Sequence, residues 1–252
     1  MALGGKAEAV GRIVIFSATS GIARAVAEEF LAQGEELVLT GRSKESLDAV
    51  ARDLQVLSGK AIPCFVWDVL GFAEHERLFR ELIAVHDISG LFMAAGIQIP
   101  QKECDAEPAK TLLTFNTNLN GPVAVMTLFA QHFKQTNSGF ISCVSSVAGD
   151  RGRGSITAYA SSKAGLSAHL QGLANRLKNT GVLIQCVKPG YVRTPMTAGL
   201  RSLLIVSPRW AARDIVNAIR KKREVVYTPF FWKYIMLVIR AIPEPLFRKL
   251  GL

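Results

Sequence analysis

Short apolar runs alternate with longer amphipathic stretches up to about residue 187, and this alternation restricts the possible folds more than any other feature of the chain. The apolar runs predict buried strands at residues 12–16, 37–40, 61–66, 91–95, 140–144 and 183–187. The stretches between them have helical spacing and predict helices at residues 21–33, 44–57, 72–85, 108–136 and 157–180. Nearly continuous apolar strands that alternate with helices are typical of a parallel sheet with both faces covered. The sequence therefore predicts an α/β fold, a doubly wound parallel sheet whose ligands lie at the carboxyl ends of its strands.

Length and charge distribution favour one domain with a distinctive C-terminal end. A chain of 252 residues is long enough for one large α/β domain and short for two. We expect this domain to span residues 1–228, and residues 229–252 to form a basic, hydrophobic C-terminal extension of the same domain. Most of the net charge of +10 comes from residues 201–252, which hold eleven Lys or Arg and three acids. Because the basic charge is confined to this end, we expect no nucleic-acid partner.

The cysteines and histidines are not spaced like metal ligands, so we expect no metal site. The cysteines lie far apart and three of them fall in apolar runs, which predicts buried free thiols. They are Cys64, Cys104, Cys143 and Cys186. The histidines are predicted on helix surfaces, as surface or packing residues, and they are His75, His86, His132 and His169. No long apolar region follows a basic start, so we expect no secretory signal and a cytoplasmic protein.

Tyr159 and Lys163 are four residues apart in a predicted helix, and residues at this spacing lie on one helix face. An ammonium beside a phenol stabilises the phenolate, so we expect the pKa of Tyr159 to fall. A tyrosine of lowered pKa can give and take a proton nearer neutral pH.

The turn after the first predicted strand runs from Ser17 to Ala23 and is built from small residues. Such a turn lets the backbone approach a pyrophosphate, whose charge is stabilised by the N-terminus of the following helix. An ordinary strand–helix turn is the alternative. Of the three glycines expected in a dinucleotide-binding turn, only Gly21 is present, with Ser17 at the first position and Ala23 at the third. Serine is unfavourable at the first position if the turn requires a positive φ.

Five motifs follow one another along the chain. They are Thr19-Ser20-Gly21-Ile22-Ala23, Ala94-Ala95-Gly96, Asn118-Leu119-Asn120-Gly121, Ser145-Ser146 with Tyr159 and Lys163, and Pro189-Gly190-Tyr191-Val192-Arg193-Thr194. In this order they resemble the short-chain dehydrogenase/reductase family over about residues 11–223, and the 13 residues from Ser146 to Tyr159 are the interval typical of that family. The resemblance implies a Rossmann-type fold, an oxidoreductase activity, and a homodimer or homotetramer formed through the helices predicted at residues 108–136 and 157–180. Burial of these helices in the core of one subunit is the alternative.

The same resemblance implies a proton relay of four residues. Tyr159 would protonate the substrate carbonyl oxygen, or deprotonate an alcohol in the reverse direction. Lys163 would lower the tyrosine pKa and bind the nicotinamide ribose, and Asn118 would hold a water that links Lys163 to solvent. Ser146 would donate a hydrogen bond to the substrate oxygen. Adjacent strand residues point to opposite faces, so Ser145, the competing serine, would face away.

The residues after the second strand indicate which dinucleotide binds. A free ribose 2′-hydroxyl requires a carboxylate there, whereas a 2′-phosphate requires a guanidinium. No acid ends this strand, and Arg42 and Ser43 follow it, so we expect NADP(H) in preference to NAD(H). A solvated basic helix start is the alternative. By resemblance, the full set of cofactor contacts is Ser17, Thr19, Ser20, Gly21, Ile22, Arg42, Ser43, Asp68, Val69, Ala95, Gly96, Tyr159, Lys163, Pro189, Gly190, Val192 and Thr194.

The C-terminal extension contains an aromatic and aliphatic segment bounded by Pro229 and Pro243. Its 13 intervening residues are too few for a membrane-spanning helix, which requires about 20. Lys233 and Arg240 are seven residues apart and share a helix face. This pattern suits a helix lying on an anionic membrane, and the alternative is a cap over the substrate cleft or a subunit interface. A membrane-bound helix and a cap are compatible if the helix forms a hydrophobic entrance for a lipid substrate.

Residues 196–206, where the resembling family carries its substrate lid, are apolar with one cation and no acid. Apolar walls select a hydrophobic ketone or secondary alcohol over a sugar or small acid. The extension is also weakly similar to members that reduce polyprenyl-phosphate-linked keto-sugars. We therefore predict an NADP(H)-dependent oxidoreductase acting on a hydrophobic or lipid-linked substrate, with the extension at the inner face of a membrane. The alternative is a catalytically idle dinucleotide-binding sensor or membrane-associated scaffold.

Overall fold

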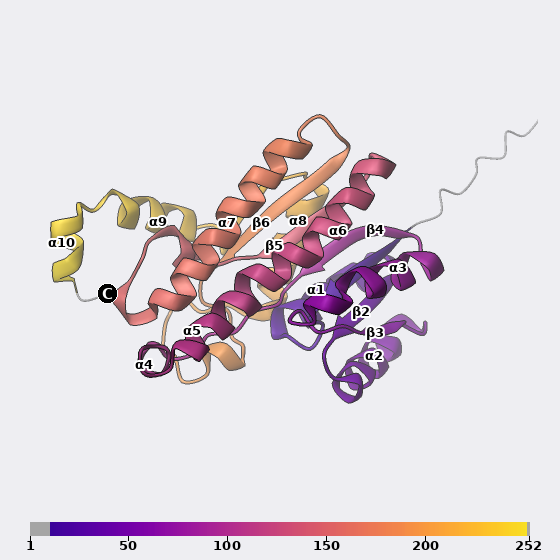
Figure 1. Ribbon diagram of the computed structural model, residues 1–252, viewed down its shortest axis with the longest axis horizontal. Helices are drawn as coiled ribbons and strands as arrows, with labels where there is room; N and C mark the ends of the chain where they lie inside the picture. Colours follow the sequence, from indigo (N-terminus) through magenta and orange to yellow (C-terminus); the bar gives the residue numbers. More distant parts are fainter. Residues whose placement is uncertain (1–10, 251–252) are drawn as a thin grey trace, which may run out of the picture.

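A seven-stranded parallel sheet forms the centre of the protein in a computed structural model that describes residues 11–250 (Figure 1). Its strands lie in the order β3-β2-β1-β4-β5-β6-β7, so the strand order reverses between β1 and β4. Ligands of doubly wound sheets bind at this reversal. The strands are β1 (Arg12–Phe16), β2 (Leu37–Gly41), β3 (Cys64–Val66), β4 (Ile88–Met93), β5 (Gly139–Val144), β6 (Val182–Pro189) and β7 (Val225–Thr228).

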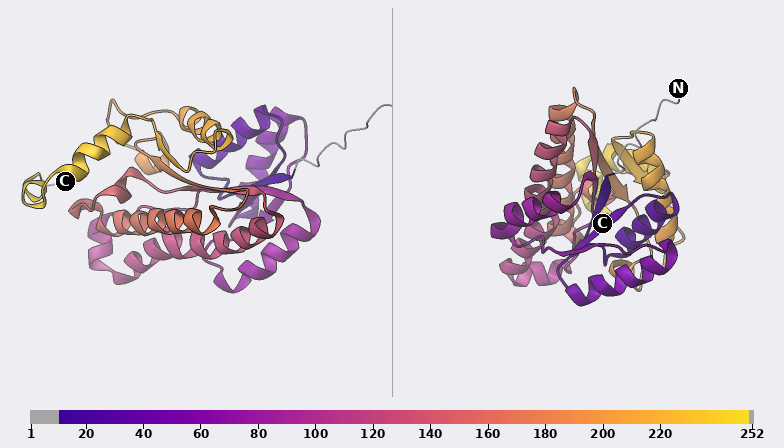
Figure 2. Two further views of the ribbon diagram at one scale, coloured as in Figure 1. Left: turned by 90° about the horizontal axis from the view of Figure 1, so that it is seen from above. Right: turned by 90° about the vertical axis from the view of Figure 1, so that its right-hand side faces the viewer.

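Helices cover both faces of the sheet, as Figure 2 shows. On one face α3, α6 and α7 pack against the strands through a core that includes Trp67, Phe129 and Leu166. On the other face α1, α2 and α8 bury Phe30, Leu47 and other apolar side chains. The helices are α1 (Gly21–Ala32), α2 (Lys44–Ser58), α3 (His75–Val85), α4 (Gln101–Ala106), α5 (Pro108–Phe115), α6 (Gly121–Thr136), α7 (Thr157–Leu177), α8 (Pro208–Arg220), α9 (Trp232–Ala241) and α10 (Glu244–Lys249). The predicted doubly wound fold is confirmed.

The helix predicted at residues 108–136 is not continuous. A five-residue π-helical segment, Asn116–Asn120, separates α5 from α6, and Gly121 N–H donates to the Asn116 carbonyl within it. Pro122 follows, and because proline has no N–H it cannot donate to the carbonyl four residues earlier, which is that of Asn118. The prediction therefore missed a local change of helix type, and this change occurs at one of the predicted site residues.

One predicted surface residue is buried instead. His75 at the start of α3 is 3% exposed, and its Nδ1 accepts a hydrogen bond of 2.9 Å from the Trp67 indole. Burial lowers the pKa of His75 because it disfavours the charged imidazole. The prediction of a surface position was wrong for this histidine, whereas its alternative as a packing residue is correct.

The C-terminal helices pack on the domain at the end of the sheet beyond β6 and β7. Trp232 and Met236 of α9 are buried with Val147, which follows β5. Arg151 forms a 2.6 Å ion pair with Glu244 of α10 and lies over the Phe247 ring. Residues 11–250 contain no helix long and apolar enough to cross a membrane. The inward face of α9 is thus part of the domain, while its outward face remains exposed.

Candidate active site

The carboxyl ends of β1, β4, β5 and β6 surround a cavity of about 270 Å³. Segments far apart in the chain meet here because parallel strands end at the same edge of the sheet. Of the predicted site residues, the cavity is lined by Thr19, Ser20, Gly21, Ile22, Ala95, Gly96, Ser146, Tyr159, Lys163, Pro189, Gly190, Val192 and Thr194. The structure therefore brings the four distant motifs that carry these residues into one site.

Tyr159 and Lys163 both face this cavity from α7, but they do not interact as expected. The Lys163 ammonium donates a 2.8 Å hydrogen bond to the carbonyl of Val144 at the end of β5. Burial lowers the pKa of Lys163 to about 8, since the charged form loses solvation. Burial raises the pKa of Tyr159, and a hydrogen bond with Ser146 opposes the rise. The expectation of a lowered tyrosine pKa is wrong for the chain by itself, because burial raises the pKa by more than the hydrogen bond with Ser146 lowers it, and Lys163 is not among the groups that shift it.

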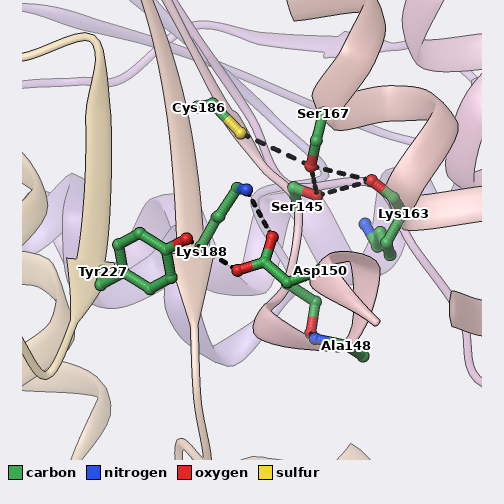
Figure 3. A network of polar contacts seen from close by, with 9 residues as sticks. Ser145, Ala148, Asp150, Lys163, Ser167, Cys186, Lys188 and Tyr227 are labelled. Carbon is green, nitrogen blue, oxygen red and sulfur yellow. Dashed lines mark hydrogen bonds and ion pairs between the residues drawn. The ribbon is translucent and has the colours of Figure 1, made fainter. Parts of the chain in front are cut away.

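The two serines that follow β5 point to different places. The Ser146 hydroxyl lies in the cavity beside Tyr159 and also accepts a 3.0 Å hydrogen bond from the N–H of Ala148. The Ser145 hydroxyl instead reaches α7, where it donates to the Lys163 carbonyl and contacts the Ser167 hydroxyl at 2.7 Å (Figure 3). Ser145 thus fixes the strand end against the helix, and Ser146 is the serine available to a ligand.

Asn118 lies in the π-helical segment and is fully buried. Its side-chain oxygen accepts from Ile97 N–H at 2.8 Å, and its amide donates to the Ile97 carbonyl and to the Ser162 hydroxyl. A Cβ on Gly96 would lie 3.4 Å from the Asn118 oxygen and 3.2 Å from Lys163 Nζ. The amide is therefore occupied in joining the segment after β4 to α7. Its main-chain carbonyl is the group that Pro122 leaves without the usual helical donor.

The turn after β1 adopts the strained conformation that the sequence raised as a possibility. Ser17 has φ 62°, in the left-handed region that glycine adopts at low cost. Ser20 caps α1, because its hydroxyl accepts a 3.2 Å hydrogen bond from Ala23 N–H. The first turn of α1 has no acid, so its N-terminus presents unopposed N–H groups to the cavity. Gly21 lies close to Thr194, since a Cβ added at Gly21 would be only 3.2 Å from the threonine methyl.

These features fit a nicotinamide dinucleotide. Small residues and an acid-free helix N-terminus suit its pyrophosphate, and the cavity continues from there to Tyr159 and Lys163. Arg42 and Ser43 are exposed directly after β2, and Ser43 caps α2 through a bond from Ser46 N–H. The other predicted contacts outside the cavity lining are Ser17, Asp68 and Val69. These three residues, together with Arg42 and Ser43, follow β1, β2 or β3 at the same edge of the sheet.

A family model described as short chain dehydrogenase matches residues 12–203 of this chain. The chain belongs to the short-chain dehydrogenase family. It is also 31% identical over 239 residues to an uncharacterized oxidoreductase of Streptomyces coelicolor, with 94% of this chain and 95% of the relative covered. The family is one of oxidoreductases that use a nicotinamide dinucleotide, so the residues predicted to form the proton relay lie in an oxidoreductase scaffold.

Solved structures share the fold of this short-chain dehydrogenase. The bulky-bulky ketone specific alcohol dehydrogenase from Comamonas testosteroni superimposes with a TM-score of 0.78 at 23% identity, covering 93% of this chain and 95% of the other. A short-chain dehydrogenase from Sphingobium yanoikuyae in complex with NADPH has a TM-score of 0.76 at 23% identity, covering 93% and 97%. At this identity the similarity establishes the arrangement of strands and helices.

A second cavity of about 550 Å³ adjoins the first in this short-chain dehydrogenase. Ser146 and Tyr159 line both cavities, and so does Gly190. The sequence did not identify two further lining residues, Arg153 and Trp232. Arg153 lies between the predicted site residues Ser146 and Tyr159 in the chain, and this position was the sequence signal that it could line the site. Nothing in the local pattern of α9 indicates that Trp232 reaches this cavity.

A buried charge network beside the site was also missed. Asp150, which ends the turn after Ser146, accepts hydrogen bonds from Lys188 at 2.5 Å and from the Tyr227 hydroxyl at 2.7 Å (Figure 3). Burial beside this carboxylate raises the pKa of Tyr227. Lys188 immediately precedes Pro189, so the network ties the serine segment to the segment that lines the cavity opposite it. The sequence signal for this network was Lys188, a charged residue that directly follows the apolar run and still belongs to β6.

Proposed function

We propose that this short-chain dehydrogenase is an NADP(H)-dependent carbonyl reductase or alcohol dehydrogenase that acts on a hydrophobic or lipid-linked ketone or secondary alcohol. One observation carries the proposal. The hydroxyls of Ser146 and Tyr159 lie where the cavity that we assign to the dinucleotide meets a second cavity of about 550 Å³ that we assign to the substrate. A carbonyl placed there would contact both hydroxyls at once.

Two of the four relay residues, Tyr159 and Ser146, act on the substrate oxygen in this proposal, and Lys163 and Asn118 support the tyrosine. The bound dinucleotide supplies or accepts the hydride. Tyr159 gives its proton to the carbonyl oxygen during reduction, and Ser146 donates a hydrogen bond that stabilises the developing negative charge. Lys163, held by the Val144 carbonyl, places positive charge near the phenol and binds ribose hydroxyls. Asn118 fixes the π-helical segment and offers its main-chain carbonyl to a water leading to Lys163.

The preference for NADP(H) rests on Arg42. This guanidinium is exposed after β2, and a 2′-phosphate is recognised by an arginine at this place. Ser43 offers its hydroxyl at the N-terminus of α2, where an anion is favoured. The preference is measured as the ratio of the dissociation constants for NADPH and NADH. Arg42→Ala should raise that ratio at least tenfold, because the dissociation constant for NADPH increases while that for NADH does not, and an unchanged ratio would remove the support for NADP(H).

The hydrophobic substrate is supported by the walls of the second cavity, which include Met196, Leu200 and Ile156. The structurally similar enzyme from Comamonas testosteroni is described as specific for bulky ketones. The outward face of α9 adds a route for a lipid, because Leu237 and Val238 are each 65% exposed there. Lys233 and Arg240 on the same helix would meet anionic headgroups.

Contact with an anionic membrane is tested by sedimentation with phosphatidylglycerol vesicles. Leu237→Ser combined with Val238→Ser should abolish sedimentation without unfolding the chain, since both side chains are exposed. A matched control is Val85→Ser, because Val85 is 63% exposed at the end of α3, far along the chain from α9. Failure of the unmodified protein to sediment would end the membrane proposal, and with it the placement at the inner face of a membrane in the cytoplasm.

We also propose a homodimer or homotetramer that forms through α5, α6 and α7. Leu112 and Leu113 of α5 are exposed on this side, which supports burial by a second copy. Sedimentation equilibrium gives the oligomeric state, and Leu112→Asp should shift it toward monomer. A monomer at micromolar concentration in the unmodified protein would contradict the proposal.

Oxidation of NADPH with a panel of hydrophobic ketones tests the reaction. Tyr159→Phe should lose turnover by at least 100-fold while its NADPH dissociation constant changes little, because only the proton donor is removed. Absence of turnover with every ketone and alcohol tested would favour the idle dinucleotide-binding sensor or scaffold. The strained Ser17 turn is the feature that motivates this alternative.

A further inference from the structure

The second cavity holds one charged group. Among the residues that the structure describes, Arg153 is the only charged side chain in its lining, and no carboxylate lines it. The remaining lining is apolar or carries neutral polar groups such as Ser155 and Gln98. A cavity with this lining has a positive potential that no nearby carboxylate of the lining offsets.

The Arg153 side chain has no partner within residues 11–250. Its Nε is buried without a hydrogen bond, and the guanidinium forms no ion pair there. Its neighbour Arg151 shows the contrast, since that guanidinium binds Glu244 and lies over Phe247. Because no carboxylate neutralises this guanidinium, an anionic group in the cavity would gain a charge-assisted interaction with its terminal nitrogens.

Trp232 lines the same cavity without offering a donor to it. Its indole N–H has no hydrogen-bond partner within residues 11–250, but the nitrogen is fully buried, so a ligand in the cavity does not reach it. The ring packs against Gly190 and forms part of the apolar wall. Arg153, from the loop between β5 and α7, is therefore the charged group that faces the cavity into which Ser146 and Tyr159 open.

We infer that the substrate carries an anionic oxygen group, a carboxylate or a phosphate, which binds Arg153 while the substrate carbonyl lies at Tyr159. The inference rests on the proposed reductase function and narrows its substrate class to acidic amphiphiles. A guanidinium offers a planar set of donors that matches two oxygens of a carboxylate or phosphate. The apolar lining contacts the body of the same molecule. Arg153 is therefore a specificity-determining residue.

Matched ketones test this assignment through kinetics with NADPH. The series has one aryl-alkyl ketone body ending in a carboxylate, a phosphate monoester or a neutral methyl ester. We expect the unmodified enzyme to have a higher kcat/KM for an acid than for the ester. Arg153→Met should reduce this acid-to-ester ratio by about 10- to 100-fold, mainly through KM, and Arg153→Lys should reduce it less. The acid-to-ester ratio is measured separately for the carboxylate and the phosphate ketone, and the larger of the two ratios identifies the preferred anionic group.

Two further variants separate local binding from general attraction. Arg201→Met removes the same charge from the exposed lid outside the cavity lining, and it should leave the acid-to-ester ratio unchanged. Trp232→Phe keeps an aromatic ring in the cavity wall and removes an N–H that the ligand does not reach, so it should also leave the ratio unchanged. Equal kcat/KM for acid and ester in the unmodified enzyme would overturn the inference. An equal loss in the Arg153 and Arg201 variants would also overturn it.

A thermal-shift measurement does not depend on turnover. The saturated carboxylic acid of the same body, which lacks the ketone, should raise the Tm of the unmodified protein and not that of Arg153→Met. If no ketone is reduced but this shift persists, the reductase function fails while the anion site stands. If the ester is reduced, the saturated acid gives no shift and neither acidic ketone is preferred kinetically, the function stands and the anion site fails.

Discussion

Replacing Ser17 by glycine should stabilise the protein, because the backbone at this position already has a glycine-like conformation. Ser17 has φ 62°, and the left-handed region is about 1–2 kcal/mol unfavourable for a residue with a Cβ. Glycine also makes the unfolded chain more flexible, and this offsets about 0.4–1 kcal/mol of the strain that the substitution relieves. The Ser17 side chain makes no hydrogen bond within residues 11–250, so little else is lost. We expect a net gain of about 0.5–1 kcal/mol.

Urea unfolding and thermal melting measure this gain. In a domain of this size 1 kcal/mol corresponds to about 2–4 °C, so the Tm should rise by about 1–4 °C. The urea midpoint should rise without a change in m, because a change in m would indicate an altered unfolded ensemble. Two controls share the reasoning. Lys222→Gly at φ 50° should also stabilise, whereas Gly34→Ala at φ 84° should destabilise although no atom lies within 4 Å of its Cβ.

A lower urea midpoint for Ser17→Gly, with the two controls behaving as expected, would refute the reasoning at this site. It would mean that the Ser17 hydroxyl stabilises the turn by more than the strain destabilises it. A second measurement addresses function. Since the turn already has the required backbone shape, the NADPH dissociation constant should change by less than about tenfold, or 1.4 kcal/mol. A larger gain in affinity would show that the serine side chain obstructs the pyrophosphate.

Three further substitutions test the site and its supports. Gly190→Ala should destabilise by about 1–3 kcal/mol in urea unfolding, because its Cβ would overlap the Trp232 indole, and the loss should shrink in a Trp232→Ala background. Lys163→Met should change how stability depends on pH, because the pKa of Lys163 is lower in the folded protein than in the unfolded chain. As the pH rises from 8 to 10.5, the unmodified protein should gain up to about 3 kcal/mol of unfolding free energy relative to the variant, since the unfolded lysine binds more protons there; a pH-independent difference would contradict the lowered pKa. Tyr227→Phe should lower the unfolding free energy by about 1–2 kcal/mol, since Asp150 loses a donor, and an unchanged urea midpoint would show that Lys188 alone satisfies the carboxylate.

Features that depend on neighbours in the chain were predictable from the sequence. The alternation of strands and helices places Gly21, Gly96 and Ser146 at the ends of parallel strands, and parallel pairing then brings them together. The four-residue spacing places Tyr159 and Lys163 on one face of α7. The interval between Ser146 and Tyr159 singled out the serine that lies beside the tyrosine.

Features that depend on burial were not predictable in the same way. Spacing predicts that Lys163 is near Tyr159, but the desolvation that raises the tyrosine pKa depends on every element packed around α7. His75 is buried because Trp67 supplies a donor from the segment after β3, a pairing that no helix pattern contains. The π-helical segment could have been anticipated, because Pro122 lies inside an otherwise regular helical pattern.

The placement of Trp232 changes how the C-terminal extension must be studied. Its indole is 6% exposed and packs on Gly190, so the extension contributes a wall to the cavity that contains Tyr159. Removing residues 230–252 would therefore alter substrate binding and membrane contact together, and a loss of either could not be assigned. Surface substitutions at Leu237 and Val238 change the outward face alone, because the inward face of α9 is formed by Trp232 and Met236. A cap and a membrane contact are compatible in one helix, since the two properties depend on opposite faces.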